Sequence, residues 1–199
     1  MQKLWEERYK VPEYIYGREP NLWFKAFIDS HRPGRVFLPG EGEGRNAVYA
    51  ARNGWQVDAA DQSPSARDKA LKLAEEYRVY LTYSVTDILE MEIPANTYDA
   101  IGLIYLHKTP GQRELFYPKL IRSLKPGGWL VLEAFYKKQI HNDTGGPKEI
   151  SMLFSIDELR NYFRELAIVE LEEQEQILKE GLLHQGKADT IRMMAMRRW

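Results

Sequence analysis

The stretch FLPGEGEGRNAVYAA, Phe37 to Ala51, places three glycines at alternate positions between an apolar run and a helical pattern. Val36 to Pro39 is a short apolar run closed by Pro-Gly, which predicts a strand that reaches a turn. From Arg45 onward the apolar residues fall on one face of a helix, and Asn53-Gly54 is a stop signal at its end. Two readings of the glycines remain open at this point, a nucleotide-binding turn and a flexible bend.

The same alternation of short apolar runs and helical patterns continues along the chain. Further strands are expected at 55–61, 79–85, 98–106, 129–136, 167–178 and 188–196, and further helices at 63–78, 110–124 and 155–163. Strands that alternate with helices and then end in a strand hairpin are typical of the α/β class. We expect a Rossmann-like, doubly wound, mostly parallel seven-stranded sheet with an antiparallel C-terminal edge strand and helices on both faces.

Length and composition fit one globular domain. The 199 residues, 29% of them charged, suit a single domain at 1–199, with 1–34 as an N-terminal lid or cover segment and 35–199 as a Rossmann-like core. Lys and Arg number 28 against 29 Asp and Glu, so no global positive field is available for nucleic acid. Cysteine is absent and no apolar run approaches about 20 residues. We therefore expect a cytoplasmic monomer or homodimer without a membrane partner.

The position of the glycine turn predicts a ligand site. In such a fold the ligand lies beyond the carboxyl ends of the strands, and Asp61, at the end of the next strand, has the spacing of a ribose-binding carboxylate. Arg45 stands where a dinucleotide fingerprint requires its third glycine. Glu41 and Glu43 would repel a pyrophosphate and would suit a ligand that carries an ammonium or a sulfonium. S-adenosylmethionine combines a nucleoside with both cations.

An ordered series of motifs supports that reading. The segments PGEGEGRN, VDAADQS, TDI, YDAIGLIYLH and LKPGGWLVLEAFY, with the terminal strand pair, resemble the class I S-adenosylmethionine-dependent methyltransferases. Within them the chain is similar to the bacterial branch that includes tellurite-resistance and thiopurine-type methyltransferases, whose members often begin with W-x-E-R-Y, here WEERY. The likeness spans nearly the whole chain.

The resemblance implies a role for individual residues. It implies that the cofactor is bound by Gly40 and Gly42 at its methionine part, Asp61 at the ribose hydroxyls, Gln62 along the adenine, Asp87 at the adenine amino group, the main chain of Ile88 at a ring nitrogen, and Ile104 with Tyr105 at the sulfonium end. The family usually has an acid two residues before the first glycine, where this chain has Leu38. Glu41 either substitutes for that acid in holding the methionine amine or is simply exposed to solvent.

Methyl transfer is an in-line displacement, so the protein mainly places the acceptor and excludes water. A general base helps only an acceptor that arrives protonated, and His107, after the fourth strand, is the candidate, with a loop residue or helix cap as the alternative reading. His31, His141 and His184 belong to no recognisable constellation, and no metal site is expected. The polar loop 136–149 is expected to border the acceptor, whereas the aromatic rings of the N-terminal segment either contact the cofactor or cover the core.

The sequence therefore predicts an enzyme that transfers a methyl group from S-adenosylmethionine to a small-molecule acceptor. A metalloid oxyanion, a thiol and another small metabolite are open as acceptors. One alternative is a sensor or partner-binding module that binds S-adenosylmethionine without transferring its methyl group. A second is an NAD-dependent oxidoreductase, which Arg45 and the antiparallel ending disfavour.

Overall fold

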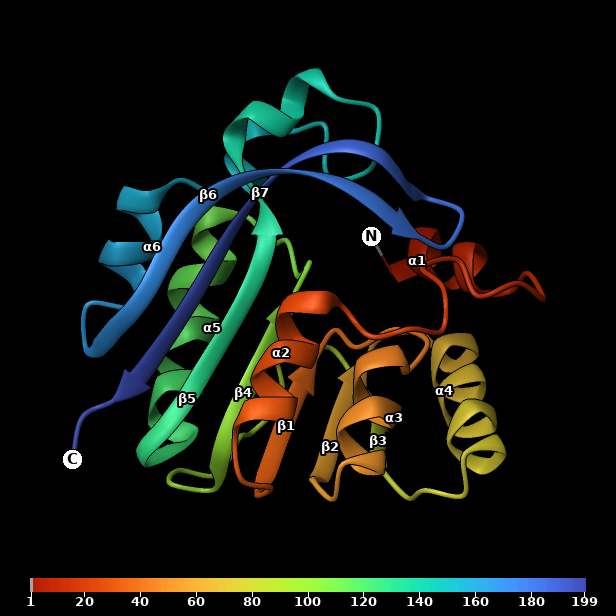
Figure 1. The fold of residues 1–199 in the computed structure, drawn as a ribbon, viewed down its shortest axis with the longest axis horizontal. Coiled ribbons are helices and arrows are strands. Elements are labelled where there is room, and N and C mark those ends of the chain that lie inside the picture. Colours follow the sequence, from red (N-terminus) through yellow and green to blue (C-terminus); the bar gives the residue numbers. More distant parts are fainter. Residues whose placement is uncertain (1) are drawn as a thin grey trace.

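The computed structural model describes residues 2–199, which form one seven-stranded sheet (Figure 1). The strand order is β3-β2-β1-β4-β5-β7-β6. The strands are β1 Arg35–Pro39, β2 Gln56–Asp61, β3 Thr82–Val85, β4 Tyr98–Ile104, β5 Leu124–Phe135, β6 Leu166–Glu180 and β7 His184–Arg197. Every pairing among β1 to β5 is parallel, and β7 runs antiparallel to both of its neighbours. The predicted α/β class with a mostly parallel sheet is confirmed.

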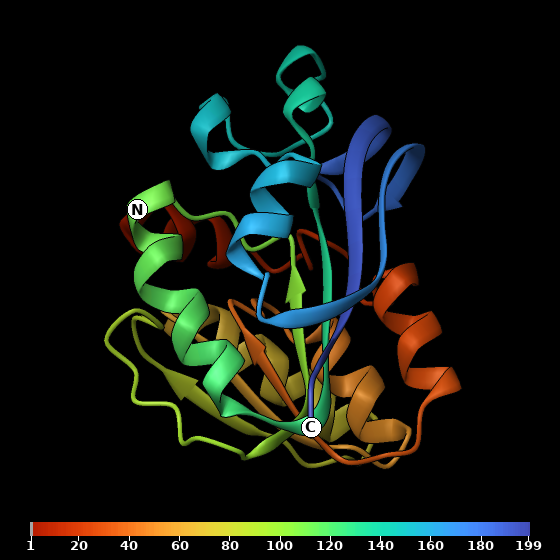
Figure 2. The same ribbon diagram turned by 90° about the vertical axis from the view of Figure 1, so that its left-hand side faces the viewer.

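Helices cover both faces of this sheet (Figure 2). They are α1 Gln2–Tyr9, α2 Leu22–Ser30, α3 Arg45–Arg52, α4 Pro64–Glu76, α5 Pro110–Ser123 and α6 Ile156–Tyr162, with short 3-10 helices at Lys137–His141 and Ile150–Met152. Local capping fixes their starts: the Ser63 hydroxyl accepts from the Ala66 N–H at 3.1 Å, and Thr109 forms a capping box with Gln112. None of the helices within residues 2–199 combines the length and apolar character needed to span a bilayer.

The core has two halves, one on each side of the sheet. Residues of α5 and α6, such as Phe116 and Leu159, pack against Leu130 and other side chains of one face. Residues of α2, α3 and α4, such as Phe24 and Leu73, pack against the opposite face. Because the central strands are buried on both sides, their sequences are continuously apolar rather than alternating.

The strand order reverses at β1, which pairs with both β2 and β4. Helices that follow these strands leave on opposite faces, so a crevice opens at the carboxyl ends of β1 and β4. This topology places the glycine turn after β1 beside the residues that follow β4. The candidate site is therefore positioned by the order of the strands.

The expected cover segment 1–34 divides into two parts, and Met1 lies outside the described residues. Helix α2 belongs to the core, because its Phe24, Phe27 and Ile28 are buried against the sheet. Residues 2–20, which we call the cover, lie across the carboxyl edge of the sheet and beside the tip of the β6–β7 hairpin (Figure 1). The main-chain N–H of Leu182 donates to the carbonyl of Ile15 at 2.7 Å and joins the cover to that tip.

The terminal hairpin differs from the prediction in two respects. The last strand, β7, lies between β5 and β6, so β6 rather than the final strand forms the edge of the sheet. The expected nine-residue connection 179–187 is mostly strand, since pairing continues to Glu180 opposite His184 and leaves only Gly181 to Leu183 as the turn. The strands were predicted too short, because the hairpin extends past the core and its residues there are polar.

Gly44 provides a test of the glycine turn. Its φ is +89°, and an added Cβ would stand 2.8 Å from the Cα of Ala70 on α4. We expect Gly44→Ala to lower the free energy of unfolding by about 2 to 5 kcal/mol, from left-handed strain and overpacking. The measurement is urea denaturation. Gly111→Ala is the control, because its Cβ would meet nothing within 4 Å and the residue lies in α5; it should be neutral or slightly stabilising. Equal losses in both variants would contradict this account.

Candidate active site

The glycine turn is fastened to the two strands beside it. Gly40 and Gly42 have φ of +69° and +66°, a backbone conformation that glycine adopts without strain. The Gly40 N–H donates to the carbonyl of Ala60 at 2.7 Å, and the Tyr83 hydroxyl donates to the carbonyl of Gly42 at 2.6 Å. The turn is therefore held by β2 and β3 in a fixed shape, and its glycines add no side chain of their own.

Asp61 lies at the end of β2 and faces this turn. Its Oδ2 accepts from the Gly42 N–H at 3.1 Å and its Oδ1 accepts from the Ser63 N–H at 3.0 Å. Burial raises the pKa of Asp61, and these main-chain hydrogen bonds partly oppose that shift. Each carboxylate oxygen has a second lone pair. The geometry thus fits a carboxylate that receives two vicinal hydroxyls of a ribose.

Glu41 turns back onto its own helix. Its Oε1 accepts from the main-chain N–H groups of Asn46 at 2.9 Å and Ala47 at 2.8 Å, in the first turn of α3. Burial raises the pKa of Glu41 to about 7, although these hydrogen bonds and Arg45 oppose the rise. The carboxylate therefore satisfies a helix terminus, and it titrates near neutral pH.

Glu43 does not face a cationic ligand, contrary to the electrostatic argument made from sequence. It is buried and its Oε1 lies 2.7 Å from Nζ of Lys69 on α4. Its other oxygen accepts from the Tyr16 N–H at 3.4 Å. The charge of Glu43 is thus compensated within the chain, and the residue anchors the cover to the core.

Arg45 connects three separate parts of the chain. Its guanidinium is buried and lies 3.0 Å from Oε2 of Glu180, at the end of β6. The same side chain donates to the carbonyl of Tyr16 at 3.2 Å. The residue that replaces the third glycine of a dinucleotide fingerprint therefore joins α3 to the hairpin tip and to the cover.

The residues after β3 lie near Asp61. Asp87 is exposed, and its Oδ1 accepts from the Leu89 N–H at 3.0 Å within its own turn. Ile88 buries its side chain in the core. Lys108, which sequence reasoning did not select, interacts with both Asp61 and Asp87; burial lowers its pKa, and the two carboxylates oppose this. The main-chain N–H of Gln62 also contacts the Asp61 carboxylate.

Ile104 and Tyr105 stand at the carboxyl end of β4. Ile104 packs against the half of the core that contains α2. Tyr105 has a left-handed φ of +51°, and its N–H donates to the carbonyl of Glu133 at 2.7 Å. Its hydroxyl donates to Oε1 of Glu133 at 2.8 Å. The ring is therefore fixed at both ends beside the crevice.

A buried polar network around Glu133 supports Tyr105. Gln176 on β6 donates to Oε1 of Glu133 at 2.7 Å, and Arg192 on β7 donates to its Oε2 at 3.0 Å. Gln176 also donates to the Thr190 hydroxyl at 2.9 Å. Such a fully connected network fixes side-chain positions in a medium of low dielectric constant. It fixes the hairpin against β5 and against Tyr105.

His107, the predicted base, has both ring nitrogens engaged in hydrogen bonds. Its Nδ1 lies 3.0 Å from the carbonyl of Met152, and its Nε2 accepts from the Phe135 N–H at 3.4 Å. Burial lowers the pKa of His107 to about 4. Both ring nitrogens are engaged, so the imidazole is a neutral support for the segment before Leu153.

The histidine that sequence reasoning set aside, His184, lies among the site residues. Its Nδ1 is 3.1 Å from Oε2 of Glu180, and its ring centroid is 4.7 Å from that of Tyr105. Tyr16 of the cover lies on it at 4.5 Å. The sequence signal that could have identified His184 is the strand hairpin, because a three-residue turn places Glu180 and His184 opposite each other.

Aromatic rings continue from His184 into the cover. Tyr16 lies 6.5 Å from Tyr9, which stacks on Trp5 at 5.8 Å between ring centroids. The Tyr9 hydroxyl stands 2.8 Å from where a Cβ on Gly42 would be. Burial and Asp61 raise the pKa of Tyr9. The cover thus closes over the glycine turn, where sequence alone left the role of these rings open.

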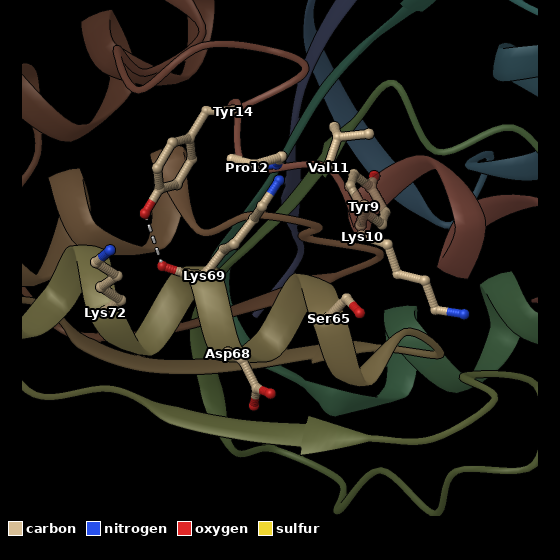
Figure 3. A pocket seen from close by; sticks show the side chains of 9 residues that line it. All are labelled: Tyr9, Lys10, Val11, Pro12, Tyr14, Ser65, Asp68, Lys69 and Lys72. Carbon is tan, nitrogen blue, oxygen red and sulfur yellow. Dashed lines mark hydrogen bonds between the residues drawn. The ribbon is translucent and has the colours of Figure 1, made fainter.

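A cavity of about 330 Å³ separates the cover from α4 (Figure 3). Its lining includes Tyr9, Tyr14, Ser65 and Lys72, and the figure shows the Tyr14 hydroxyl bonded to the carbonyl of Lys69. None of the predicted cofactor residues line it. This space marks where the cover is least tightly packed on the core.

The low pKa of His107 gives a test in terms of stability. The unfolded imidazole titrates near about 6.5, so acidification from about 6.5 to about 4 protonates the unfolded chain first and lowers the free energy of unfolding, by up to about 3 kcal/mol. In His107→Asn, which keeps a donor for Met152 but does not titrate, this loss should be absent. The measurement is urea denaturation at several pH values. Parallel pH curves for parent and variant would show that His107 is not buried and neutral.

Comparison with known proteins extends these observations. Residues 37–128, which contain the glycine turn, Asp61, Asp87 and Tyr105, match the family model described as a methyltransferase domain. No curated protein matches the sequence.

Solved structures share the fold. A protein from work on the conversion of a disulfide bond into a thioacetal group during echinomycin biosynthesis aligns at TM-score 0.82 and 17% identity, over 100% of this chain and 93% of that chain. TehB from Haemophilus influenzae aligns at TM-score 0.73 and 18% identity, over 88% of this chain and 61% of that chain. The N-methyltransferase NodS from Bradyrhizobium japonicum WM9, in complex with S-adenosyl-L-homocysteine, aligns at TM-score 0.71 and 15% identity, over 98% and 97%.

The domain match supports the class of reaction, whereas the structural neighbours support only the fold. Residues 37–128 match a methyltransferase domain, and this match supports an enzyme that uses S-adenosylmethionine.

Proposed function

We propose that this enzyme methylates a small molecule. The observation that carries the proposal is the closure of the carboxyl edge by the chain itself. The cover is joined to the hairpin tip by Leu182 and Ile15, and the loop before Lys148 reaches the same place, since a Cβ on Gly145 would stand 3.2 Å from Nε2 of His184. An acceptor that reaches Tyr105 beneath this closure is small. The even balance of charge favours a small acceptor over a nucleic acid.

The residues of the crevice suit the parts of the cofactor. Gly40 and Gly42 present backbone without side chains and would lie along the methionine part, and Asp61 would receive the ribose hydroxyls. Asp87, the main chain of Ile88 and Gln62 would surround the adenine, and Ile104 with Tyr105 would line the sulfonium end. The hydroxyl of Tyr9 makes no hydrogen bond with the residues described here, 2–199, and faces Gly42.

Catalysis would rest mainly on placement. S-adenosylmethionine supplies an electrophilic methyl group on a sulfonium. The chain's own contribution is to hold the acceptor in line with that methyl group and to exclude water. Tyr105, fixed by Glu133, would orient the acceptor side, and the cover would close the site over the bound molecules. No covalent intermediate with the protein is needed.

Sulfur and metalloid acceptors are the favoured classes. The opening WEERY and the ordered motifs are similar to the branch with tellurite-resistance and thiopurine-type methyltransferases. The neighbour from echinomycin biosynthesis concerns a disulfide bond and a thioacetal group, which supports a small sulfur compound. We expect the enzyme to act in the cytoplasm as a monomer or homodimer. The direct test is formation of S-adenosylhomocysteine with a panel of thiols and oxyanions of tellurium and selenium; binding without turnover on every acceptor would favour a sensor instead.

The role of Asp61 can be tested by binding. A ligand at about 100 times its dissociation constant stabilises a protein by about 2.7 kcal/mol, or about 5 to 10 °C for a chain of this size. We expect this shift with S-adenosylmethionine and S-adenosylhomocysteine but not with NAD. Asp61→Ala should lose it, because the ribose contacts are gone.

Asp58→Ala is the matched control for this experiment. Asp58 is also buried on β2, but it lies toward the other end of the strand and pairs with Arg35 at 2.7 Å. Its variant should be less stable without ligand and still show the full shift. A full shift in Asp61→Ala would remove Asp61 from the ribose role.

Glu41 can be tested by counting protons. Its pKa of about 7 means that about half of the molecules carry a proton there at pH 7. If the carboxyl holds the methionine ammonium, binding lowers the pKa of Glu41 and releases up to about half a proton. Calorimetry in two buffers of different ionisation enthalpy measures this release. Glu41→Gln should release fewer protons on binding, by that amount. Equal proton release in both proteins would show that Glu41 only caps the first turn of α3.

A further inference from the structure

The hairpin tip holds a histidine and a carboxylate in register. Glu180 ends β6 and His184 begins β7, and the two are direct partners across the strands. His184 Nδ1 lies 3.1 Å from Oε2 of Glu180. His184 is only 4% exposed, so this contact is shielded from water. A carboxylate at Nδ1 keeps the proton on that nitrogen and leaves the lone pair on Nε2.

Glu180 is itself fixed from two other elements. Arg45 on α3 lies 3.0 Å from the same Oε2, and Asn21 donates to Oε1 at 3.4 Å. Burial alone would raise the pKa of Glu180, but His184 and Arg45 outweigh burial and hold that pKa at about 2. The carboxylate is therefore charged at every working pH, and it cannot rotate away from the imidazole without breaking the contact with Arg45.

The other ring nitrogen of His184, Nε2, makes no hydrogen bond within residues 2–199. It is not one of the polar side-chain atoms of these residues that are both fully buried and unpaired. The ring lies among Tyr16, Tyr105 and Phe135, at centroid distances of 4.5, 4.7 and 5.4 Å. Tyr105 follows β4 at the sulfonium end of the proposed site. Nε2 therefore has no hydrogen-bond partner among residues 2–199, and Gly145 of the loop after β5 lies beside it, since an added Cβ there would stand 3.2 Å from Nε2.

We propose that His184, oriented by Glu180, is the general base of the reaction, and that the methyl acceptor arrives protonated, as a hydroxyl or a thiol. This inference rests on the proposed function. His184 Nε2 takes the proton of the acceptor O–H or S–H bond, and the electron pair of that bond stays on the acceptor atom. That atom forms the new bond to the methyl carbon, and the pair of the broken carbon–sulfur bond stays on sulfur. The imidazolium keeps the proton beside Glu180 until water removes it.

The arrangement selects against other acceptors. A thioether or an oxyanion that is already deprotonated has no proton to give, so a buried histidine and carboxylate pair would serve no purpose for it. His107 does not offer the same function, because both of its nitrogens are engaged. The proposal thus narrows the acceptor from any small molecule to one with an ionisable hydroxyl or thiol.

The charges around His184 set the sign of the pH dependence. Burial lowers the pKa of His184, and Glu180 opposes this most strongly. A base works when neutral, so the rate should fall as pH falls through the pKa of His184 in the complex. The groups that face it are Glu180 on β6, Arg45 on α3, Glu133 on β5, Tyr105 and His107 after β4, and Tyr16 of the cover.

The kinetic test compares His184→Gln with the parent on thiol and phenol acceptors. We expect kcat to fall by about 100-fold to 10,000-fold, the acid limb of the pH profile to disappear, and the thermal shift with S-adenosylhomocysteine to persist. His31→Gln is the control, because His31 follows the last turn of α2, contacts Phe27 and Trp129 rather than any residue of the candidate site, and should leave rate and profile unchanged. If His184→Gln kept the rate and pH profile of the parent, the assignment of His184 as the general base would be overturned. A parent that binds cofactor and methylates nothing would overturn the proposed function instead.

A second measurement needs no acceptor. Long-range proton–nitrogen NMR spectra of the parent report which nitrogen of each imidazole carries the proton. We expect His184 as the neutral Nδ1–H tautomer, with Nε2 unprotonated, and we expect its signal to be absent from His184→Gln. The Nε2–H tautomer would overturn the proposal, since that nitrogen could not accept a proton.

Discussion

The buried ion pair between Arg45 and Glu180 holds the site together. It joins the helix after the glycine turn to the end of β6, and Arg45 also holds the cover through Tyr16. Desolvating two charges is costly, and a buried pair often stabilises a fold no more than apolar side chains would. Removing one partner, by contrast, leaves an unpaired charge in the interior. The pair therefore makes closure of the crevice specific: only one arrangement of turn, hairpin and cover satisfies both charges.

Much of the fold could be predicted from local signals. Ser63 before Pro64 marked the start of a helix, the apolar run 98–106 marked a strand buried on both faces, and the glycine turn marked the first crossover. These features depend on neighbours in sequence, so a single chain reveals them. Helix α2 was missed because its strongly apolar residues were taken as part of a cover, although Phe24 and Phe27 lie in the core.

The site was less predictable, because its charges are set by distant partners. The sequence suggests that Glu43 is available to a cationic ligand, but its charge is neutralised by Lys69, which is distant in the sequence. His107 lies at the carboxyl edge of the sheet, as predicted, but its two ring nitrogens contact the Met152 carbonyl and the Phe135 N–H. His184 lay in a segment expected to be a loop. Position relative to a strand end was predictable; the direction and partners of a side chain there were not.

The docking of the cover on the hairpin tip has a consequence for biosynthesis. The carbonyl of Ile15 receives the N–H of Leu182, so the cover meets this partner only after the whole chain between them has been made. Strand β7, which lies between β5 and β6, must also be made before the hairpin is complete. The nascent chain can build the glycine turn early, yet it cannot close it. The crevice thus remains open until the hairpin tip has been made, and until then Tyr16 lacks the His184 ring on which it packs.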